Sequence, residues 1–151
     1  MIPTIPYIEA KFDEFNKLIF GSELPRIPIV LSKRKGQVAS FSCTISKVFF
    51  LKNKYFEPKF TFSTRYDYTE RQLEDVIIHE MIHYYIRFKG LKDEGSHGPI
   101  YVKIMNEINQ KFGRNITIKQ DTKDVGLVDT KPKQRIIAVL EKKDGTVGIK
   151  V

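Results

Sequence analysis

The chain has 151 residues, of which 41% are hydrophobic and 29% are charged, and its net charge at pH 7 is +8. This length and composition predict one domain with a hydrophobic core, and they exclude a disordered tail, a collagen-like fibre and a disulfide-rich scaffold. The only cysteine, Cys43, has no partner in the chain, which favours a reducing, cytoplasmic location. Neither membrane anchoring nor secretion is expected, because the sequence has no run of about 20 apolar residues and no signal-peptide pattern.

A helix is predicted first, between Pro6 and Gly21, because proline suits a first helical turn and glycine a helix end. Its apolar residues recur at i, i+4, i+7 and i+11, as one buried face of a helix requires. Three short β-rich runs follow at 27–31, 38–45 and 48–51. We expect these runs to form three strands of an antiparallel sheet.

The next stretch, 52–68, is predicted to be either an edge strand or an extended loop, because Pro58 has no backbone N–H to donate to a sheet. A long helix then begins after Thr69. Gln72 stands three residues further on, which completes a capping box, and the helical pattern continues to Gly90.

A third helix is predicted from Pro99 to Gly113. Near the end of the chain, two β-rich runs on either side of a glycine-containing turn predict a hairpin. We therefore divide the chain into a main domain, residues 1–130, and a C-terminal β-hairpin, residues 131–151. The expected fold class is α+β, with three helices packed on a small antiparallel sheet.

The long predicted helix carries the pattern H-E-x-x-H, formed by His79, Glu80 and His83. Two histidines four residues apart lie on the same face of a helix, so both imidazoles can bind one metal ion. A carboxylate beside such an ion can take a proton from metal-held water, which gives metal-assisted hydrolysis. The alternative interpretation is that both histidines are ordinary helix residues, but their place in a capped helix favours the metal site.

A catalytic zinc ion usually takes three protein ligands and keeps one position open. His97, the remaining histidine, is the leading candidate for the third ligand, since it follows a glycine-bearing loop that can fold back. Glu107 is the alternative, but a helical wheel places it beside the apolar stripe of the third helix, with which His97 is aligned. The metzincin pattern is excluded, because it would require histidine where Lys89 stands.

Together these residues resemble the SprT-like metallopeptidases, over about residues 11 to 120. Four segments are similar to family patterns and stand in the family's order. Residues 15–25 hold F-N and then F-G-S-E-L-P, where the family has F-G-x-L-P, and residues 73–83 resemble the active-site helix. Residues 95–99 are G-S-H-G-P, similar to the family's G-H-G-P, and residues 113–118 are G-R-N-I-T-I, similar to G-x-N-I-T-V. The resemblance implies a zincin-like fold in which His79, His83 and His97 bind Zn²⁺ and Glu80 is the general base.

The resemblance further implies a zinc-dependent endopeptidase with a protein or peptide substrate, including proteins associated with DNA. Many family members follow this domain with a zinc ribbon whose cysteine pairs hold the metal. Residues 131–151 contain no cysteine, so the predicted hairpin is interpreted either as a metal-free remnant of such a ribbon or as the end of a chain truncated at its C-terminus.

Basic residues are concentrated in the stretch 33–65, which has eight of them against one acidic residue. Aromatic residues are interleaved with them, a mixture that suits phosphate contacts and base stacking on single-stranded DNA. The alternative is that the aromatics belong to the core and the lysines to a solvated strand face. The predicted nucleic-acid contacts are Lys33, Arg34, Lys35, Lys52, Lys54 and Lys59.

Three functions therefore compete. They are the endopeptidase acting on proteins bound to or near DNA, a non-catalytic nucleic-acid-binding module with a structural metal, and a peptidase for a dedicated partner or peptide with no role for DNA. A structural zinc is normally closed by four protein ligands, and the chain has no cysteine pair to complete such a set, which favours the enzyme. A phenol near the metal is a candidate donor to the oxyanion, but the sequence does not choose among Tyr84, Tyr85 and Tyr101.

Overall fold

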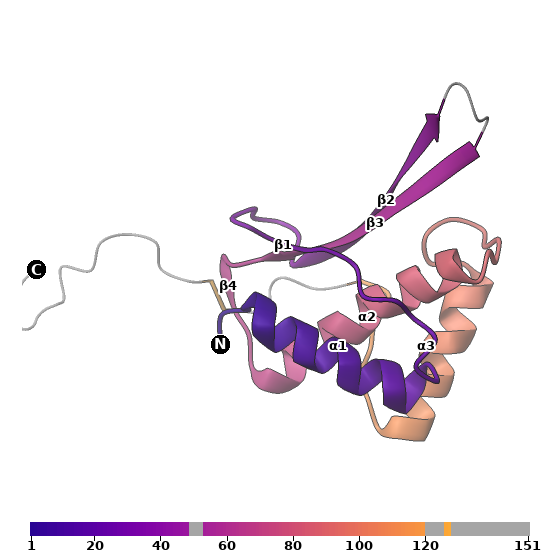
Figure 1. Ribbon diagram of the computed structural model, residues 1–151. Coiled ribbons are helices and arrows are strands. Elements are labelled where there is room, and N and C mark those ends of the chain that lie inside the picture. Colours follow the sequence, from indigo (N-terminus) through magenta and orange to yellow (C-terminus); the bar gives the residue numbers. More distant parts are fainter. Residues whose placement is uncertain (49–52, 120–125, 128–151) are drawn as a thin grey trace, which may run out of the picture.

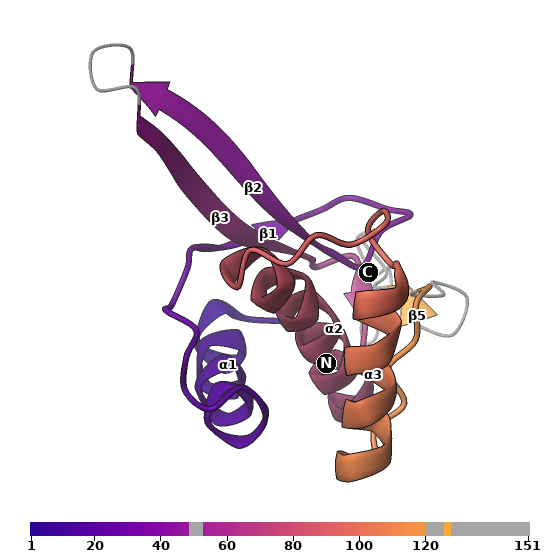
Figure 2. The same ribbon diagram turned by 90° about the vertical axis from the view of Figure 1, so that its right-hand side faces the viewer.

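Three helices and five strands make up the part of the chain that the computed structural model describes, residues 1–48, 53–119 and 126–127. In chain order they are α1 (Ile5–Ile19), β1 (Ile29–Ser32), β2 (Ala39–Val48), β3 (Asn53–Ser63), β4 (Tyr66–Asp67), α2 (Glu70–Phe88), α3 (Pro99–Phe112) and β5 (Gly126–Leu127). The helices lie on one side of the sheet formed by β1 to β3, and α2 lies between α1 and α3 (Figures 1 and 2). The predicted α+β class and its three helices are confirmed.

The main sheet is mixed, so the prediction of an antiparallel sheet was wrong. Its strand order is β1-β3-β2, and β3 pairs antiparallel with β2 but parallel with β1. The prediction assumed that consecutive strands are neighbours. Instead β3, the second strand of the β2–β3 hairpin, lies between β1 and β2. It runs in the same direction as β1. Of the predicted strand at 48–51, Val48 ends β2, and the other residues lie outside the described part.

Pro58 lies within β3, the central strand, so the stretch 52–68 contributes a strand that the sequence left undecided. The amide of Phe60 donates to the carbonyl of Pro28 at 3.0 Å, on the β1 side of β3. Because amides two residues apart point the same way, the nitrogen of Pro58 also faces that side. There β1 pairs only with Phe60 and the residues after it, so Pro58 removes no hydrogen bond between β3 and its neighbours.

Local capping signals explain where the helices begin. The Thr69 side chain accepts from the Gln72 amide at 3.1 Å, and the Gln72 side chain accepts from the Thr69 amide at 2.9 Å. The predicted capping box is thus confirmed. α1 begins in the same manner, with the Thr4 hydroxyl accepting from the Tyr7 amide at 3.3 Å.

The core lies between the sheet and the three helices. α2 is its central element, since it contacts α1, α3 and β2. This explains why α2 buries residues on several faces instead of one stripe. The most deeply buried side chains include Ile8 and Phe15 of α1, Phe60 and Phe62 of β3, Leu73, Ile77, Ile78, Met81 and Ile82 of α2, and Tyr101 of α3.

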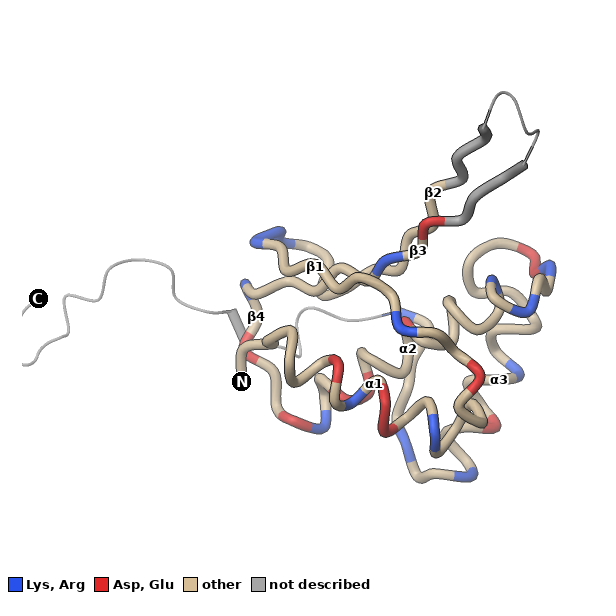
Figure 3. Tube along the Cα trace, viewed as in Figure 1, with Lys and Arg blue, Asp and Glu red and all other residues tan. Residues whose placement is uncertain are grey.

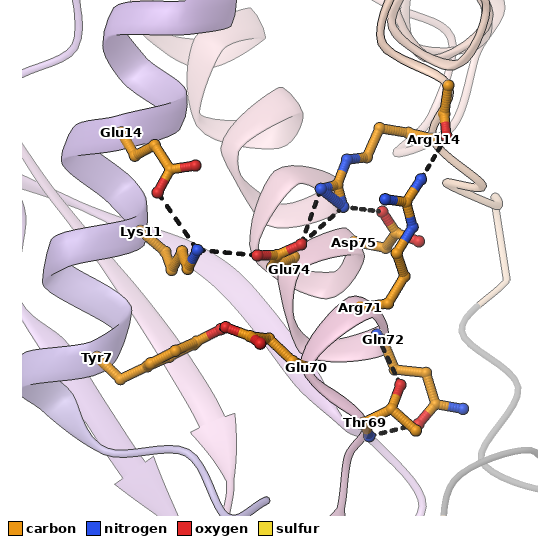
Figure 4. A network of polar contacts seen from close by, with 11 residues as sticks. Tyr7, Lys11, Glu14, Thr69, Glu70, Arg71, Gln72, Glu74, Asp75 and Arg114 are labelled. Atoms are coloured by element: carbon orange, nitrogen blue, oxygen red, sulfur yellow. Dashed lines mark hydrogen bonds and ion pairs between the residues drawn. The ribbon is translucent and has the colours of Figure 1, made fainter.

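A network of charged side chains joins the first turns of α2 to its neighbours (Figure 4). Glu74 receives the Lys11 ammonium of α1 at 2.9 Å and the Arg114 guanidinium at 2.8 Å. Arg114 also reaches Asp75 at 3.1 Å. The side chains of Glu74, Asp75 and Arg114 are each less than 15% exposed. The network therefore fastens both α1 and the segment after α3 to α2.

The C-terminal hairpin predicted for residues 131–151, and with it the division at residue 130, lies outside the described residues. In the described part, β5 pairs antiparallel with β4, which places residues 126–127 beside the entry to α2. Among the described helices, none is long and apolar enough to cross a membrane.

Candidate metal centre

The first two histidines of the site are presented by α2. His79 and His83 stand one helical turn apart, with ring centroids 5.1 Å apart. His79 is buried and His83 is half-buried. As the four-residue spacing predicts, both rings project from one face of α2. α2 itself is held between α1 and α3.

The third histidine, His97, lies on the loop between α2 and α3, directly before the Gly98 that caps α3. Its Nε2 atom is 3.1 Å from Nε2 of His83 and 3.4 Å from Nε2 of His79. One nitrogen from each of the three rings lies within 4.8 Å of the other two. All three histidines of the chain thus meet at one point.

Two of the three nitrogen separations fit a zinc ion. A tetrahedral site with Zn–N bonds of about 2.0 to 2.1 Å places its nitrogen ligands roughly 3.3 Å apart. The Nε2 separations of 3.1 and 3.4 Å bracket that spacing. Imidazole is a ligand that suits zinc as well as copper, iron and nickel, and a set of three leaves a fourth position for water or substrate.

The tautomer of His79 is set by the backbone. Its Nδ1 lies 2.8 Å from the carbonyl oxygen of Thr117, which can only accept a hydrogen bond. Nδ1 therefore carries the proton of the neutral ring, and the lone pair of Nε2 faces the other histidines. An outer partner of this kind orients a ligating ring and raises its basicity. No sequence pattern indicates this contact, because a backbone carbonyl acceptor is present in every residue type.

The rings are held neutral by their surroundings. Burial, together with the charge that His83 would carry, lowers the pKa of His79 to about 3. Burial and the neighbouring His97 lower the pKa of His83 to about 4, and burial also lowers the pKa of His97. Neutral imidazole is the form that binds a metal ion, so the site is prepared for one at neutral pH.

Tyr101 of α3 packs against all three histidine rings. Its ring centroid is 4.6 Å from that of His83, 4.8 Å from that of His97 and 5.4 Å from that of His79. The Tyr101 side chain is fully buried, and its hydroxyl donates to the backbone carbonyl of His79 at 3.1 Å. Tyr101 therefore packs against the histidine cluster, and its hydroxyl is already hydrogen-bonded.

Glu80 is buried beside the cluster, with a carboxylate oxygen 3.9 Å from Nε2 of His79. It lines a cleft of about 670 Å³ together with the three histidines. Residues 38–41, around the start of β2, also line this cleft, as do Ile118 and Lys119. A carboxylate thus stands at the same cavity as three neutral imidazoles.

The sequence comparison decides the family. A sequence model of the SprT-like family matches residues 8–121 of the chain. The chain belongs to the SprT-like family. The proposed resemblance is therefore confirmed.

Curated relatives of this SprT-like chain carry the name DNA-dependent metalloprotease SPRTN. The one from Xenopus tropicalis is 31% identical over 120 residues, which cover 79% of the chain and 26% of that protein. The one from Rattus norvegicus is 29% identical over 119 residues, covering 78% of the chain and 23% of that protein. The chain thus spans about a quarter of the length of these relatives. No solved structure is significantly similar to it.

Other residues singled out in this SprT-like sequence do not join the cluster. Glu107, the alternative third ligand, is exposed on α3 and lines a different cavity. The Tyr84 hydroxyl donates to the Pro25 carbonyl at 2.8 Å, and the Tyr85 ring packs against Phe20. None of the tyrosines considered as oxyanion donors lines the cleft.

The predicted nucleic-acid contacts fall in different places. Lys33, Arg34 and Lys35 are exposed in the loop between β1 and β2, which forms a basic segment in Figure 3. Lys59 is exposed on β3, apart from that loop. The positions of Lys52 and of the Lys54 side chain lie outside the described part. Gly36 and Gln37, the next residues of the basic loop, line the cleft, so the loop leads to the histidine cluster.

Proposed function

We propose that this SprT-like chain is a zinc-dependent endopeptidase in which His79, His83 and His97 hold the ion and Glu80 is the general base. The observation that carries the proposal is the convergence of three neutral imidazoles and one carboxylate on an open cleft. Three protein ligands with an open fourth position are typical of catalytic zinc sites, whereas structural sites are closed by four. The cluster in the described part offers three.

The chemistry follows from the positions of these groups. When bound, zinc polarises a carbonyl and lowers the pKa of a coordinated water to about 7. Glu80 is next to His79 in the chain and borders the same cleft, so its carboxylate is placed to accept the water's proton and to pass it to the leaving amine. The Thr117 carbonyl keeps His79 in the tautomer that ligation needs.

A peptide substrate is supported by the strand that borders the cleft. Among the described strands β2 lies at an edge of the sheet, and its first residues line the same cavity as the histidine cluster. An extended peptide can add to such an edge through main-chain hydrogen bonds, which recognises a backbone without selecting a sequence. A histidine-bearing helix beside such a strand supports the zincin-like fold that the resemblance implies.

We include DNA in the proposal as a site of action, so that the substrates are proteins on or near single-stranded DNA. The relatives are named DNA-dependent metalloproteases. The exposed basic loop of Lys33, Arg34 and Lys35 continues into the cleft wall, so a bound strand would lie near the catalytic residues.

The test is zinc content and proteolysis, with and without single-stranded DNA, for the wild type and Glu80→Gln. We expect Glu80→Gln to keep its zinc and to lower the rate of cleavage about 10²- to 10⁴-fold. Glu107→Gln, which alters an exposed carboxylate of α3, is the matched control and should match the wild type. A zinc-free wild type, or full activity in Glu80→Gln, would refute the peptidase. DNA binding without any cleavage would favour the non-catalytic module.

A further inference from the structure

The loop that carries His97 is closed by the carboxylate of Asp93. One oxygen of Asp93, Oδ1, accepts the amides of Glu94 at 2.9 Å and Ile100 at 3.1 Å. The other oxygen, Oδ2, accepts the amide of Tyr101 at 2.8 Å. A single side chain at the start of the loop is therefore bonded to the first turn of α3, with His97 between the two attachment points.

These bonds replace a helix cap that α3 lacks at its own first position. The N-cap residue is Gly98, which has no side chain to accept a hydrogen bond, and Pro99 follows it. The amides of Ile100 and Tyr101 would otherwise be among the unpaired donors of the first helical turn. Asp93 supplies the acceptor that a serine or aspartate at the N-cap position normally provides.

Gly98 gives the Asp93 carboxylate the space that this closure needs. A Cβ atom on Gly98 would lie 2.3 Å from Oδ1 of Asp93 and 2.6 Å from the carbonyl oxygen of Glu94. The φ angle of Gly98 is −81°, a value that any residue adopts, so the glycine is needed for space and not for its backbone freedom. Asp93 and Gly98 thus form one closure, with the third histidine next to it.

The position of His97 depends on this closure more than on its own contacts. His79 and His83 are fixed by α2, but the His97 ring is only partly buried. Apart from the two histidines, its polar contact among the described residues is the exposed Ser96 hydroxyl at 3.2 Å. A ligand on an open loop would have to be ordered when the metal binds, at a cost in conformational entropy. The closed loop places the ring beforehand.

We propose that Asp93 is a positioning residue, which holds His97 in the metal site by tying its loop to the first turn of α3. The proposal rests on the proposed metal centre and goes beyond it, since Asp93 belongs to no ligand or base role. In this role Asp93 affects the affinity for zinc as well as the stability of α3, although its carboxylate does not contact the ion.

The test is a double-mutant cycle on zinc affinity, measured by competition with a chromogenic chelator. We expect Asp93→Ala to weaken zinc binding about 10-fold or more, as loss of an outer-sphere partner does. In a His97→Ala background the same substitution should change the affinity by less than about twofold, because the group through which it acts is gone. Glu94→Ala, which removes the neighbouring exposed carboxylate, is the control and should leave affinity unchanged.

Two further variants keep the test decisive if Asp93→Ala folds poorly. Asp93→Asn retains one acceptor oxygen and should give an intermediate affinity, and Gly98→Ala should weaken binding while the carboxylate stays present. Circular dichroism with chelator checks that each variant is folded. Equal affinity in wild type and Asp93→Asn, or an equal loss with and without His97, would overturn the role of Asp93. A wild type that binds no zinc would overturn the proposed metal centre itself.

Discussion

Asn109 binds the backbone of Ile116 with both ends of its carboxamide. Its Nδ2 donates to the Ile116 carbonyl at 2.9 Å, and its Oδ1 accepts the Ile116 amide at 2.8 Å. The next residue is Thr117, whose carbonyl accepts the Nδ1 proton of His79. An asparagine on α3 therefore fixes the acceptor that orients a proposed metal ligand on α2.

The first prediction follows from this clamp. Asn109→Ala removes two hydrogen bonds to a buried residue, so we expect unfolding to become easier by about 1 to 3 kcal/mol. Zinc affinity should also fall, by about 10-fold, because the Thr117 carbonyl is less well placed. Chelator competition and urea unfolding measure the two effects. Asn106→Ala alters an exposed asparagine of the same helix and should change neither. A loss of stability with unchanged affinity would contradict the link to His79.

The second prediction concerns Arg114, which pairs with Glu74 and Asp75 in a nearly solvent-free place. Arg114→Met keeps much of the side-chain volume but leaves two largely shielded carboxylates without this partner. Removing one member of a buried pair costs about 3 to 5 kcal/mol, and the remaining Lys11 contact to Glu74 should keep the loss near the lower end.

The control for Arg114 is another arginine that pairs with a carboxylate on the surface. Arg26 reaches Asp13 at 2.5 Å, and both side chains are about half exposed. Arg26→Met should therefore cost at most about 1 kcal/mol. Urea unfolding of the two variants, at one pH and salt concentration, compares them directly. Similar losses would mean that the network of Figure 4 contributes no more than a surface ion pair.

The third prediction is a loss of stability in acid when the metal is removed. His79 and His83 have pKa values of about 3 and 4 in the fold, against about 6.5 for an unperturbed histidine. Below pH 6.5 the unfolded chain therefore binds more protons than the folded one, so stability rises with pH. This contribution is fully present above pH 6.5 and decreases as the pH falls towards 4.

The measurement is thermal unfolding in excess chelator between pH 7.5 and pH 4.5. The midpoint of the wild type should fall across that range, beginning near pH 6.5. In the double variant His79→Gln and His83→Gln the fall should be smaller, since glutamine does not titrate. If both proteins lost stability in parallel, groups other than these histidines would govern the acid response.

Sequence reasoning succeeded where the signal was local. The Thr69 and Gln72 capping box placed α2, and the four-residue spacing placed His79 and His83 on one face of it. His97 was the leading candidate for the third ligand because it is the remaining histidine and follows a glycine-bearing loop, although spacing alone does not determine where that loop folds. These features depend on contacts within a few residues or on residue type alone.

The remaining features depend on contacts between distant segments. The place of β3 between β1 and β2 is a matter of topology, and Pro58 looked like a strand breaker because the side it faces was not known. Thr117 takes part through its carbonyl, which every residue possesses. Asp93 caps α3 from outside the position where a capping residue is sought. None of these has a signature in residue spacing.

The last prediction concerns the basic loop between β1 and β2. If it contacts single-stranded DNA, changing Lys33, Arg34 and Lys35 to glutamate should weaken binding strongly at low salt. It should also reduce the slope of log affinity against log salt by about 2, since each lost phosphate contact on a single strand contributes roughly 0.7. Fluorescence anisotropy of a labelled oligonucleotide at several salt concentrations measures both quantities.

A control with the same change in net charge distinguishes a local contact with DNA from the general electrostatic attraction between DNA and a chain of net charge +8. The control variant changes three exposed lysines that lie on the helices, outside the basic loop: Lys17, Lys103 and Lys111. Changing these to glutamate should weaken binding less and leave the slope nearly unchanged, because diffuse charge alters the field without releasing counterions at a contact. If both triple variants weakened binding equally, the loop would have no special role, and the net charge alone would explain any affinity for DNA.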